Sequence, residues 1–301
     1  MLGMSRAAIE VRDLHKAYGP LNAVDGLTVD VADGEIFAFL GPNGAGKTVT
    51  VEILEGYRQR SSGSVRVLGE DPASAGARLR SRIGIVLQTS KIADEVTVGE
   101  VVRHFAGFYP RPRDPDDVIE LVGLTDRRGS RVARLSGGQQ RRLDVALGIV
   151  GRPDLLFLDE PTTGFDPEAR RQFWGLIEQL RAEGTTILLT THYLEEAEVL
   201  ADRVGVIARG QLLAIGPPAT LGGRAEASAT VRWVASDGPH EIVTPVPTKV
   251  VAELAAGASG ELAELTVSRP SLEDVYLSMI GTPMTGTPMT DTDQPPAGAR
   301  R

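Results

Sequence analysis

The chain has 301 residues, no cysteine and a net charge of −8. Without cysteine, disulfides, zinc–thiolate sites and thiol chemistry are excluded, and the acidic balance disfavours a general nucleic-acid or anionic-membrane binder. The length suits one large domain followed by a small one.

No apolar run approaches the roughly 20 residues that a transmembrane helix needs. The first residues also lack the apolar core of a signal peptide. We therefore expect a cytoplasmic chain, unless another chain holds it at a membrane.

Two runs that alternate apolar and polar residues, 8–14 and 27–31, predict an antiparallel β patch at the start of the chain. Asp33-Gly34 is typical of a hairpin turn. Tyr18 falls in a predicted turn, where an aromatic ring either packs locally or stacks on a nucleotide base.

An apolar strand at residues 36–40 leads into Gly41-Pro-Asn-Gly-Ala-Gly-Lys-Thr48, after which a helix is expected. This is the P-loop pattern, in which glycines let backbone N–H groups converge on a phosphate. Lys47 supplies a charge for the β- and γ-phosphates, and Thr48 offers a hydroxyl to Mg²⁺. The segment therefore predicts a nucleoside triphosphate site. Its expected binding residues are Gly41, Pro42, Asn43, Gly44, Ala45, Gly46, Lys47, Thr48 and Val49.

A strand at residues 82–88 ends on Gln88, which is either a surface amide or a nucleotide-sensing residue at a carboxyl strand end. The chain then changes character. Thr97 and Glu100 form the pattern of a capping box, and a second helix is expected at residues 114–123. We interpret this region as a helical insert in an α/β core.

The stretch Leu135-Ser-Gly-Gly-Gln139 opens another helix, with Ser136 as its N-cap. Two glycines at a helix start cost stability. They also create a second nest of exposed N–H groups, so Gly137 and Gly138 predict a second anion site. The alternative is an N-cap that happens to be followed by two glycines.

Asp159-Glu160 ends a buried apolar strand in the Walker B pattern. Asp159 is placed to hold Mg²⁺ through water, and Glu160 to orient or deprotonate an attacking water. His192 follows the strand at residues 185–191. A histidine there is commonly a surface residue, but it is the third polar strand end after Gln88 and Asp159-Glu160. We therefore expect it to contact the γ-phosphate.

A small α+β unit is expected at residues 221–281, and a disordered polar tail at residues 282–301. Nothing in the small unit points to catalysis. Its predicted strands are residues 229–234 and 261–267, and its predicted helices are residues 248–256 and 271–280.

Taken in this order, the motifs resemble those of the nucleotide-binding subunits of ABC transporters, over residues 8–220. The resemblance implies an α/β, P-loop NTPase fold of the ABC ATPase type at residues 1–220. That core would contain an antiparallel β subdomain and a helical subdomain at about residues 97–150. The resemblance also implies that Tyr18 stacks on adenine and that Gln88 lies near Mg²⁺ and the transmembrane partner.

The same resemblance assigns the catalytic carboxylate to Glu160, the switch histidine to His192 and the D-loop aspartate to Asp166. Phe165 stands where leucine is commoner, a mild apolar departure. The expected catalytic set is Lys47, Glu160 and His192, and the expected metal set is Thr48, Gln88 and Asp159. The other expected nucleotide-binding residues are Tyr18, Gln88, Ser136, Gly137, Gly138 and Gln139.

Residues 135–139 correspond to the signature motif of this family. Family geometry further implies a head-to-tail dimer of two copies, in which the signature of one copy closes on the ATP held by the other. The cofactors implied are ATP and Mg²⁺. Arg269-Pro-Ser-Leu-Glu-Asp-Val-Tyr-Leu277 is similar to the terminal motif of daunorubicin-resistance-type subunits of type-2 ABC exporters, with Tyr276 where phenylalanine is commoner. This implies export of a drug, lipid, antibiotic or polysaccharide through a separate transmembrane permease, by a subunit peripheral to the inner face of the cell membrane.

Two other functions fit parts of the sequence. A soluble ABC ATPase acting on ribosomes or DNA usually has two cassettes or a coiled-coil insertion, which this chain lacks, and no nucleic-acid partner is expected. An importer ATPase would use residues 221–281 as a regulatory ligand-binding domain. A P-loop kinase would leave the signature at residues 135–139 without a role.

Overall fold

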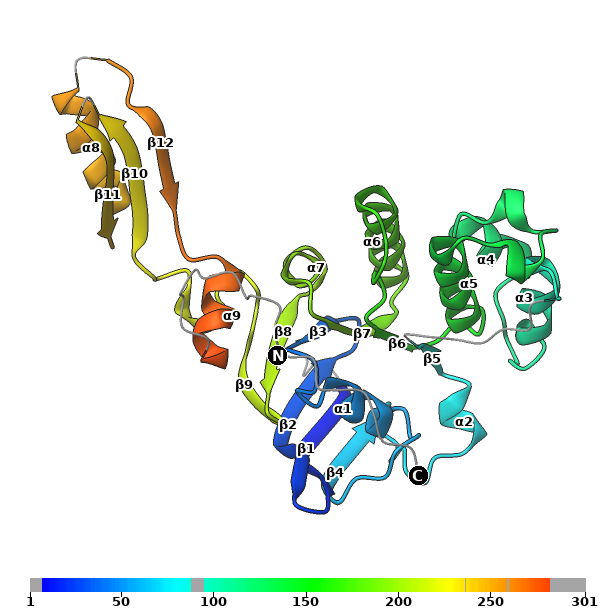
Figure 1. Ribbon diagram of the computed structural model, residues 1–301. Coiled ribbons are helices and arrows are strands. Elements are labelled where there is room, and N and C mark those ends of the chain that lie inside the picture. Colours follow the sequence, from blue (N-terminus) through cyan, green and yellow to red (C-terminus); the bar gives the residue numbers. More distant parts are fainter. Residues whose placement is uncertain (1–6, 88–94, 236, 259, 282–301) are drawn as a thin grey trace, which may run out of the picture.

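The structure, a computed structural model, describes residues 7–87, 95–235, 237–258 and 260–281. A six-stranded sheet in the order β5-β6-β7-β3-β8-β9 lies at its centre (Figure 1). Neighbouring strands are parallel except for β9, which is antiparallel to β8. The strands are β3 (Ile36–Leu40), β5 (Ile83–Val86), β6 (Leu155–Asp159), β7 (Thr186–Thr191), β8 (Arg203–Ala208) and β9 (Gln211–Gly216).

Strand β3 shows how this sheet separates two hydrophobic cores, because successive side chains of a strand point to opposite faces. Ile36, Ala38 and Leu40 join the core built with α5, α6 and α7. Phe37 and Phe39 join the core built with α1 and the antiparallel sheet. The helices are α1 (Lys47–Leu54), α5 (Gly137–Ile149), α6 (Pro167–Ala182) and α7 (Leu194–Leu200).

The antiparallel sheet has the order β2-β1-β4 and confirms the β patch predicted at the start of the chain. Two details of the prediction are wrong. Asp33-Gly34 is not a hairpin turn, because β2 and β3 belong to different sheets. Tyr18 is the last residue of β1 and not part of the turn. The strands are β1 (Ala7–Tyr18), β2 (Leu21–Ala32) and β4 (Ser62–Val67).

The helical insert is present and begins with the predicted capping box. The Thr97 hydroxyl accepts from the Glu100 N–H, while the Glu100 carboxylate accepts from the Thr97 N–H at 2.8 Å. Asp114 caps the second helix, and the third begins at Gly137, directly after the predicted N-cap Ser136. Besides α5, the region contains α3 (Val98–Ala106), α4 (Pro115–Leu121) and the 3-10 turns Thr125–Arg127 and Val132–Arg134; helix α2 (Ala77–Arg80) precedes β5.

The C-terminal unit contains a third sheet, in the order β11-β10-β12, with α8 beside it; together they extend away from the rest of the chain (Figure 1). Strand β11 was not predicted, because its sequence begins Gly-Pro-His-Glu and lacks a run of strand-forming residues. The elements are β10 (Ala229–Ala235), β11 (Gly238–Thr244), α8 (Pro247–Gly257), β12 (Ala263–Ser268), α9 (Leu272–Ile280) and the 3-10 turn Leu221–Gly223.

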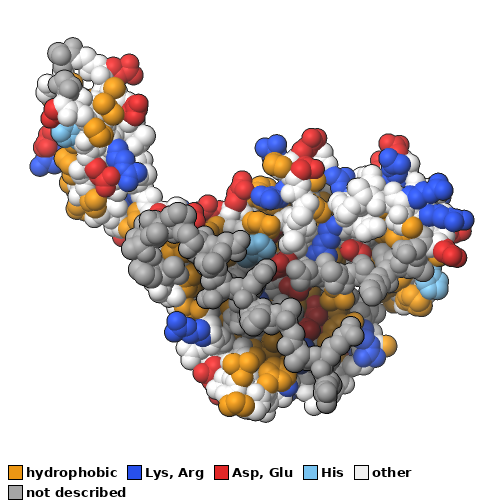
Figure 2. Space-filling model, in the orientation of Figure 1, with side chains coloured by type: hydrophobic (Ala, Val, Ile, Leu, Met, Phe, Trp, Pro, Cys, Tyr) orange, Lys and Arg blue, Asp and Glu red, His pale blue; other side chains and the backbone are white. Residues whose placement is uncertain are grey.

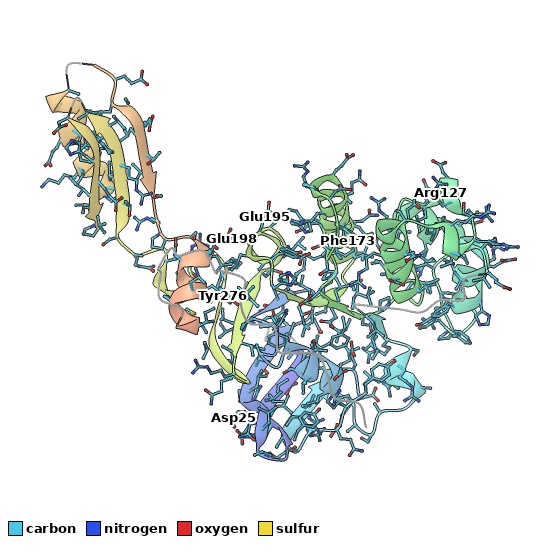
Figure 3. All side chains as sticks on the ribbon, in the orientation of Figure 1. Asp25, Arg127, Phe173, Glu195, Glu198 and Tyr276 are labelled. Carbon is cyan, nitrogen blue, oxygen red and sulfur yellow. The ribbon has the colours of Figure 1, made fainter. Side chains whose placement is uncertain are left out.

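Helix α9 joins this unit to the larger core. Leu272 is fully buried in the same hydrophobic cluster as the helices α5 to α7, and Tyr276 packs against that cluster. Arg224 donates to the Pro270 carbonyl at 3.2 Å and pairs with Glu198 of α7 at 2.7 Å. Figure 3 labels Tyr276 and Glu198 at this junction.

Lys and Arg side chains gather at the outer end of the helical subdomain (Figure 2), where Arg127 is labelled in Figure 3. Arg127 and Arg128 are exposed there, and Arg128 pairs with Asp116 at 2.8 Å. Among the residues that the structure describes, none of the helices is both long enough and apolar enough to cross a membrane. The predicted tail at residues 282–301 lies outside the described residues.

Candidate functional site

The P-loop turn joins β3 to α1 and packs tightly against its neighbours. Gly46 has a φ of +104°, and a Cβ there would lie 2.4 Å from the carbonyl oxygen of Ala23. A Cβ on Gly41 would lie 2.2 Å from the carbonyl oxygen of Ile207 in β8. Backbone packing therefore demands these glycines as much as phosphate approach does. The sequence predicted only the approach of phosphate, not the close backbone packing.

Lys47 is the first residue of α1 and is almost fully buried. Its ammonium donates to the carbonyl oxygens of Gly41 at 2.7 Å and Pro42 at 3.1 Å. Burial lowers the pKa of Lys47, while the carboxyls of Glu160 and Asp159 act in the opposite direction. The P-loop thus holds the lysine ammonium in place, and the loop and the ammonium would bind phosphate together.

A cleft of about 330 Å³ opens beside the turn and brings Glu160 to the P-loop. Positive-φ glycines, the start of α1 and one lysine converge on it, so its chemistry suits a polyphosphate. Ala23 of β2 is a lining residue that the sequence analysis missed. The cleft is lined by Ala23, Asn43, Gly44, Ala45, Gly46, Lys47, Thr48, Val49 and Glu160.

The end of β6 holds the two adjacent carboxylates through a neighbouring threonine. Thr190 of β7 donates its hydroxyl to the Asp159 carboxylate. The Glu160 N–H donates to both the carbonyl and the hydroxyl oxygen of Thr190, each at 3.1 Å. Glu160 has a φ of +45°, a left-handed conformation that non-glycine residues seldom adopt. The chain therefore turns sharply at Glu160 and is held there by Thr190.

His192 lies next to Glu160, as its place at a strand end predicts. Its Nδ1 is 3.3 Å from the Glu160 Oε1. The imidazole also contacts the Tyr193 ring, with 4.1 Å between centroids, and the Arg170 guanidinium lies over that ring at 4.9 Å. The structure thus brings His192, Glu160 and the P-loop together at one edge of the central sheet.

The signature stretch forms the predicted helix start but does not line its own P-loop cleft. The Ser136 hydroxyl accepts from the Gln139 N–H at 3.3 Å, and the Gln139 side chain accepts from the Ser136 N–H at 3.0 Å. A Cβ on Gly137 or Gly138 would meet no described atom within 4 Å. The two glycines therefore leave an open backbone surface at the start of α5.

Three other predicted residues have different surroundings. Tyr18 is half-exposed and outside the cleft lining; its hydroxyl accepts from Arg58. Asp166 caps α6 by accepting the Ala169 N–H at 2.8 Å. Phe165 is buried edge-on against Phe173, which explains why an aromatic residue is tolerated there. Gln88 lies outside the described residues.

Arg141 of α5 is a buried residue that the sequence analysis did not single out. Its guanidinium donates to the carbonyl oxygens of Pro161 at 3.0 Å and Asp159 at 2.7 Å, and also to that of Leu87. Burial lowers the pKa of this guanidinium. The Arg141 side chain thus connects α5, the helix that begins with the signature, to the chain at the ends of β5 and β6. The available signal was an arginine among the apolar positions of this helix.

A family model described as ABC transporter matches residues 24–163. The Nod factor export ATP-binding protein I of Paraburkholderia xenovorans (strain LB400) is 43% identical over 225 residues, covering 72% of this chain and 73% of that protein. The chain belongs to the ABC transporter ATP-binding family. The cassette is also 42% identical to the daunorubicin/doxorubicin resistance ATP-binding protein DrrA of Streptomyces peucetius, over 71% of this chain and 66% of that protein.

A further relative covers the cassette and the C-terminal unit together. The Nod factor export ATP-binding protein I of Burkholderia pseudomallei (strain K96243) is 37% identical, over 93% of this chain and 99% of that protein. Among solved structures, an ATP-binding subunit of an ABC transporter aligns with a TM-score of 0.65 and 27% identity, over 70% of this chain and 90% of that one. A dimeric cassette bound to ADP and Pi shares the fold at a TM-score of 0.64 and 20% identity, over 69% of this chain and 98% of that one.

Family membership confirms several predictions from the sequence. The fold is that of an ABC ATPase, the ligand is ATP and the activity is ATP hydrolysis. ATP-binding subunits of this family work with transmembrane components, and the family includes dimers.

Proposed function

We propose that this chain hydrolyses ATP to drive export of a drug, lipid, antibiotic or polysaccharide through a separate transmembrane permease. The observation that carries the proposal is Glu160, which lines the P-loop cleft and pairs with His192, in a chain whose relatives are named as Nod factor export and daunorubicin/doxorubicin resistance ATP-binding proteins. We place the chain at the inner face of the cell membrane, held there by the permease.

The nucleotide site would work through residues 41–49. Backbone N–H groups of this turn and the Lys47 ammonium hold the β- and γ-phosphates. Glu160 orients the attacking water and accepts its proton, and His192 positions Glu160 at 3.3 Å and contacts the γ-phosphate. Tyr18 would stack on adenine if its contact with Arg58 opened.

Magnesium fits this site without a dedicated protein cage. Within the described ranges, no cluster of three or more His, Cys, Asp or Glu side chains is suited to hold a metal ion. In P-loop sites the ion is shared between phosphates, water, one hydroxyl and one carboxylate. Thr48 in the cleft and Asp159 at the end of β6 supply that hydroxyl and carboxylate, and we assign Gln88 to the same site. Bound Mg²⁺ would neutralise charge that develops on the phosphates.

The signature makes a second copy of the chain part of the active site. The open backbone at Gly137 and Gly138 is an anion nest that does not line the cleft of its own chain. In a head-to-tail dimer, residues 136–139 of each copy would close on the ATP of the other. Each of the two ATP molecules would then be bound by the P-loop of one copy and by the signature of the other.

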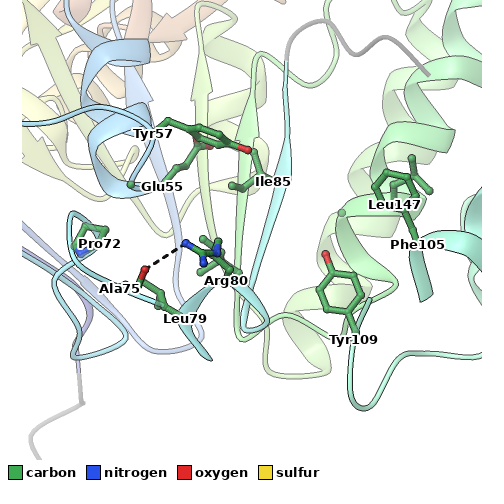
Figure 4. A pocket seen from close by; sticks show the side chains of 13 residues that line it. Glu55, Tyr57, Pro72, Ala75, Leu79, Arg80, Ile85, Phe105, Tyr109 and Leu147 are labelled. Carbon is green, nitrogen blue, oxygen red and sulfur yellow. Dashed lines mark hydrogen bonds between the residues drawn. The ribbon is translucent and has the colours of Figure 1, made fainter. Parts of the chain in front are cut away.

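We place the permease contact at the groove between the nucleotide core and the helical subdomain (Figure 4). Strand β5 lines this groove with Ile83 and Ile85 and leads directly to Gln88. A partner seated there would touch both sides of the junction that Arg141 ties together. We further propose that residues 221–281 form an accessory domain, attached through α9.

Co-purification tests the proposal. The tagged chain should be recovered from mild-detergent extracts of membranes with a polytopic membrane protein in roughly equal amount, and the complex should hydrolyse ATP faster than the chain alone. Recovery only from the soluble fraction, or with ribosomes or DNA, would contradict the export function while leaving the ATPase intact.

A further inference from the structure

The groove between the nucleotide core and the helical subdomain contains a buried carboxyl group that has no hydrogen-bond or ion-pair partner among the residues that the structure describes. Glu55 follows α1 as its C-cap and is only 8% exposed. Among the described residues, its side chain makes no hydrogen bond or ion pair, although it lines the groove. The two charged groups that act on it among the described residues, Asp159 and Glu52, are both negative. Burial, assisted by these two carboxylates, raises the pKa of Glu55 to about 8.

Among the described residues that line the same groove, Arg80 is the one cation, and it does not neutralise Glu55. The Arg80 guanidinium donates to the Ala75 carbonyl at 3.3 Å, a bond drawn in Figure 4, and forms no ion pair with Glu55. Arg58, which is nearby in sequence, is paired with Glu52 at 2.5 Å. The carboxylate of Glu55 therefore has no compensating cation within the described part of the chain.

The remaining walls of the groove suit an amphipathic protein segment. Tyr57 lies at the groove and is 73% exposed, and Phe105 and Tyr109 line the opposite side (Figure 4). Phe108 is 66% exposed and packs against Phe105, with 5.8 Å between ring centroids. Exposed aromatic residues around a cavity of about 460 Å³ are typical anchors of a protein–protein contact. The full lining is Glu55, Gly56, Tyr57, Pro72, Ala75, Leu79, Arg80, Ile83, Ile85, Phe105, Tyr109, Leu147 and Gly148.

We propose that Glu55 recognises a lysine or arginine side chain that the permease inserts into this groove, flanked by apolar residues that pack on the aromatic walls. The inference rests on the proposed function, because the permease is its occupant. A cation would give Glu55 the hydrogen bonds and the opposite charge that it lacks. A segment with a neutral or acidic side chain at that place would leave the carboxylate buried and unpaired, so Glu55 would also select against wrong permeases.

The position of the contact gives it a consequence for the ATPase. Glu55 follows directly on α1, the helix that begins with Lys47 and carries the P-loop. Phe105 and Leu147, on the other wall, belong to α3 and α5 of the helical subdomain. A permease side chain bound to Glu55 would therefore bridge the part that holds ATP and the part that carries the signature.

The test compares Glu55→Gln and Glu55→Lys with Glu52→Gln, a matched control on the same helix that lies outside the groove lining. The probe is the membrane protein recovered with the wild-type chain, purified in detergent, and the readout is its affinity for each variant. Since truncating one partner of a buried charge pair weakens binding strongly, Glu55→Gln should lower the affinity roughly 30-fold or more. Glu55→Lys should abolish binding, and Glu52→Gln should bind like the wild type.

Two further measurements give the result a single interpretation. The isolated Glu55→Gln chain should unfold cooperatively and melt at no lower temperature than the wild type, so its lost binding is not lost folding. Replacing one basic residue of a cytoplasmic permease segment by glutamate should restore binding to Glu55→Lys. Equal affinity of Glu55→Gln and wild type, or restoration by no basic residue, would overturn the Glu55 contact alone. If the wild-type chain recovers no membrane protein, both the export function and this contact fail.

Discussion

The P-loop cleft and the Glu55 groove each contain one buried ionisable side chain, and the two side chains differ in their partners. Lys47 donates to two carbonyl oxygens of its own loop. Glu55, at the other end of the same helix, has no partner within the described residues and two carboxylates acting on it. The protein chain completes the first site up to its nucleotide, whereas the second site needs a cation from outside. This difference separates a ligand pocket from a partner contact.

The largest effect is expected in the cleft. Glu160→Gln keeps the size of the side chain but removes the proton acceptor, so the ATPase rate should fall by roughly 10²- to 10⁴-fold. ATP binding should persist, because Lys47 and the P-loop backbone are unchanged. Steady-state hydrolysis and equilibrium binding of a fluorescent ATP analogue measure the two quantities. A rate within a factor of a few of wild type would show that another group is the base.

The contribution of Glu55 to folding stability should fall as pH rises, which is the opposite of what a carboxylate paired with a cation on the surface shows. The folded state keeps the Glu55 proton up to about pH 8, whereas the unfolded chain releases it near 4.5. Stability from this group is therefore complete at low pH and lost as pH rises through 8. Glu55→Gln should stabilise the protein increasingly from pH 5 to pH 9, with an upper limit of about 5 kcal/mol at about 1.4 kcal/mol per pKa unit.

Denaturant unfolding of wild type and Glu55→Gln at several pH values measures this difference, and Glu52→Gln is the control. A constant difference across pH would mean that Glu55 titrates normally and that the groove does not isolate it from water.

Arg141 tests whether the cleft and the groove are one mechanical unit. Arg141→Met leaves the carbonyl oxygens of Pro161, Asp159 and Leu87 without their donor, which should destabilise the protein by roughly 2–4 kcal/mol. It should also lower kcat more than it raises KM. Arg142→Met is the matched control, because within the described part of the chain Arg142 donates only to the exposed Gln172 side chain. Similar losses for both variants would argue against a special role for Arg141.

The smallest expected effect separates packing glycines from ligand glycines. Gly41→Ala places a Cβ against the Ile207 carbonyl and should cost about 1–3 kcal/mol of folding stability. Gly137→Ala meets open space within a helix and should leave stability unchanged or slightly higher. Melting temperatures without nucleotide provide the comparison. A destabilised Gly137→Ala would contradict the view that this glycine is kept for a ligand.

Local patterns were sufficient to predict the nucleotide core. The P-loop, the buried β6 strand, the capping box at Thr97 and the N-cap at Ser136 depend on neighbours in sequence, so their spacing reveals them. Contacts between distant segments were not predictable in the same way. The close approach of Gly41 to Ile207 and the three carbonyl contacts of Arg141 arise only when separate strand ends meet.

The groove illustrates the same limit more strongly. Glu55 stands at the end of an amphipathic helix, where a glutamate usually faces water. Its burial depends on Pro72, Leu79 and the helical subdomain closing around it. Strand β11 was missed for a different reason, since its pairing with β10 overrides a sequence with weak strand preference.

The most direct test of the account is the molar mass of Glu160→Gln with ATP and Mg²⁺, measured by light scattering after gel filtration. The account predicts a dimer that forms only with ATP and that disappears when Ser136→Glu is added, because the signature of each copy must meet the ATP of the other. A Glu160→Gln chain that stays monomeric with ATP, or a dimer that ignores the change at Ser136, would contradict it.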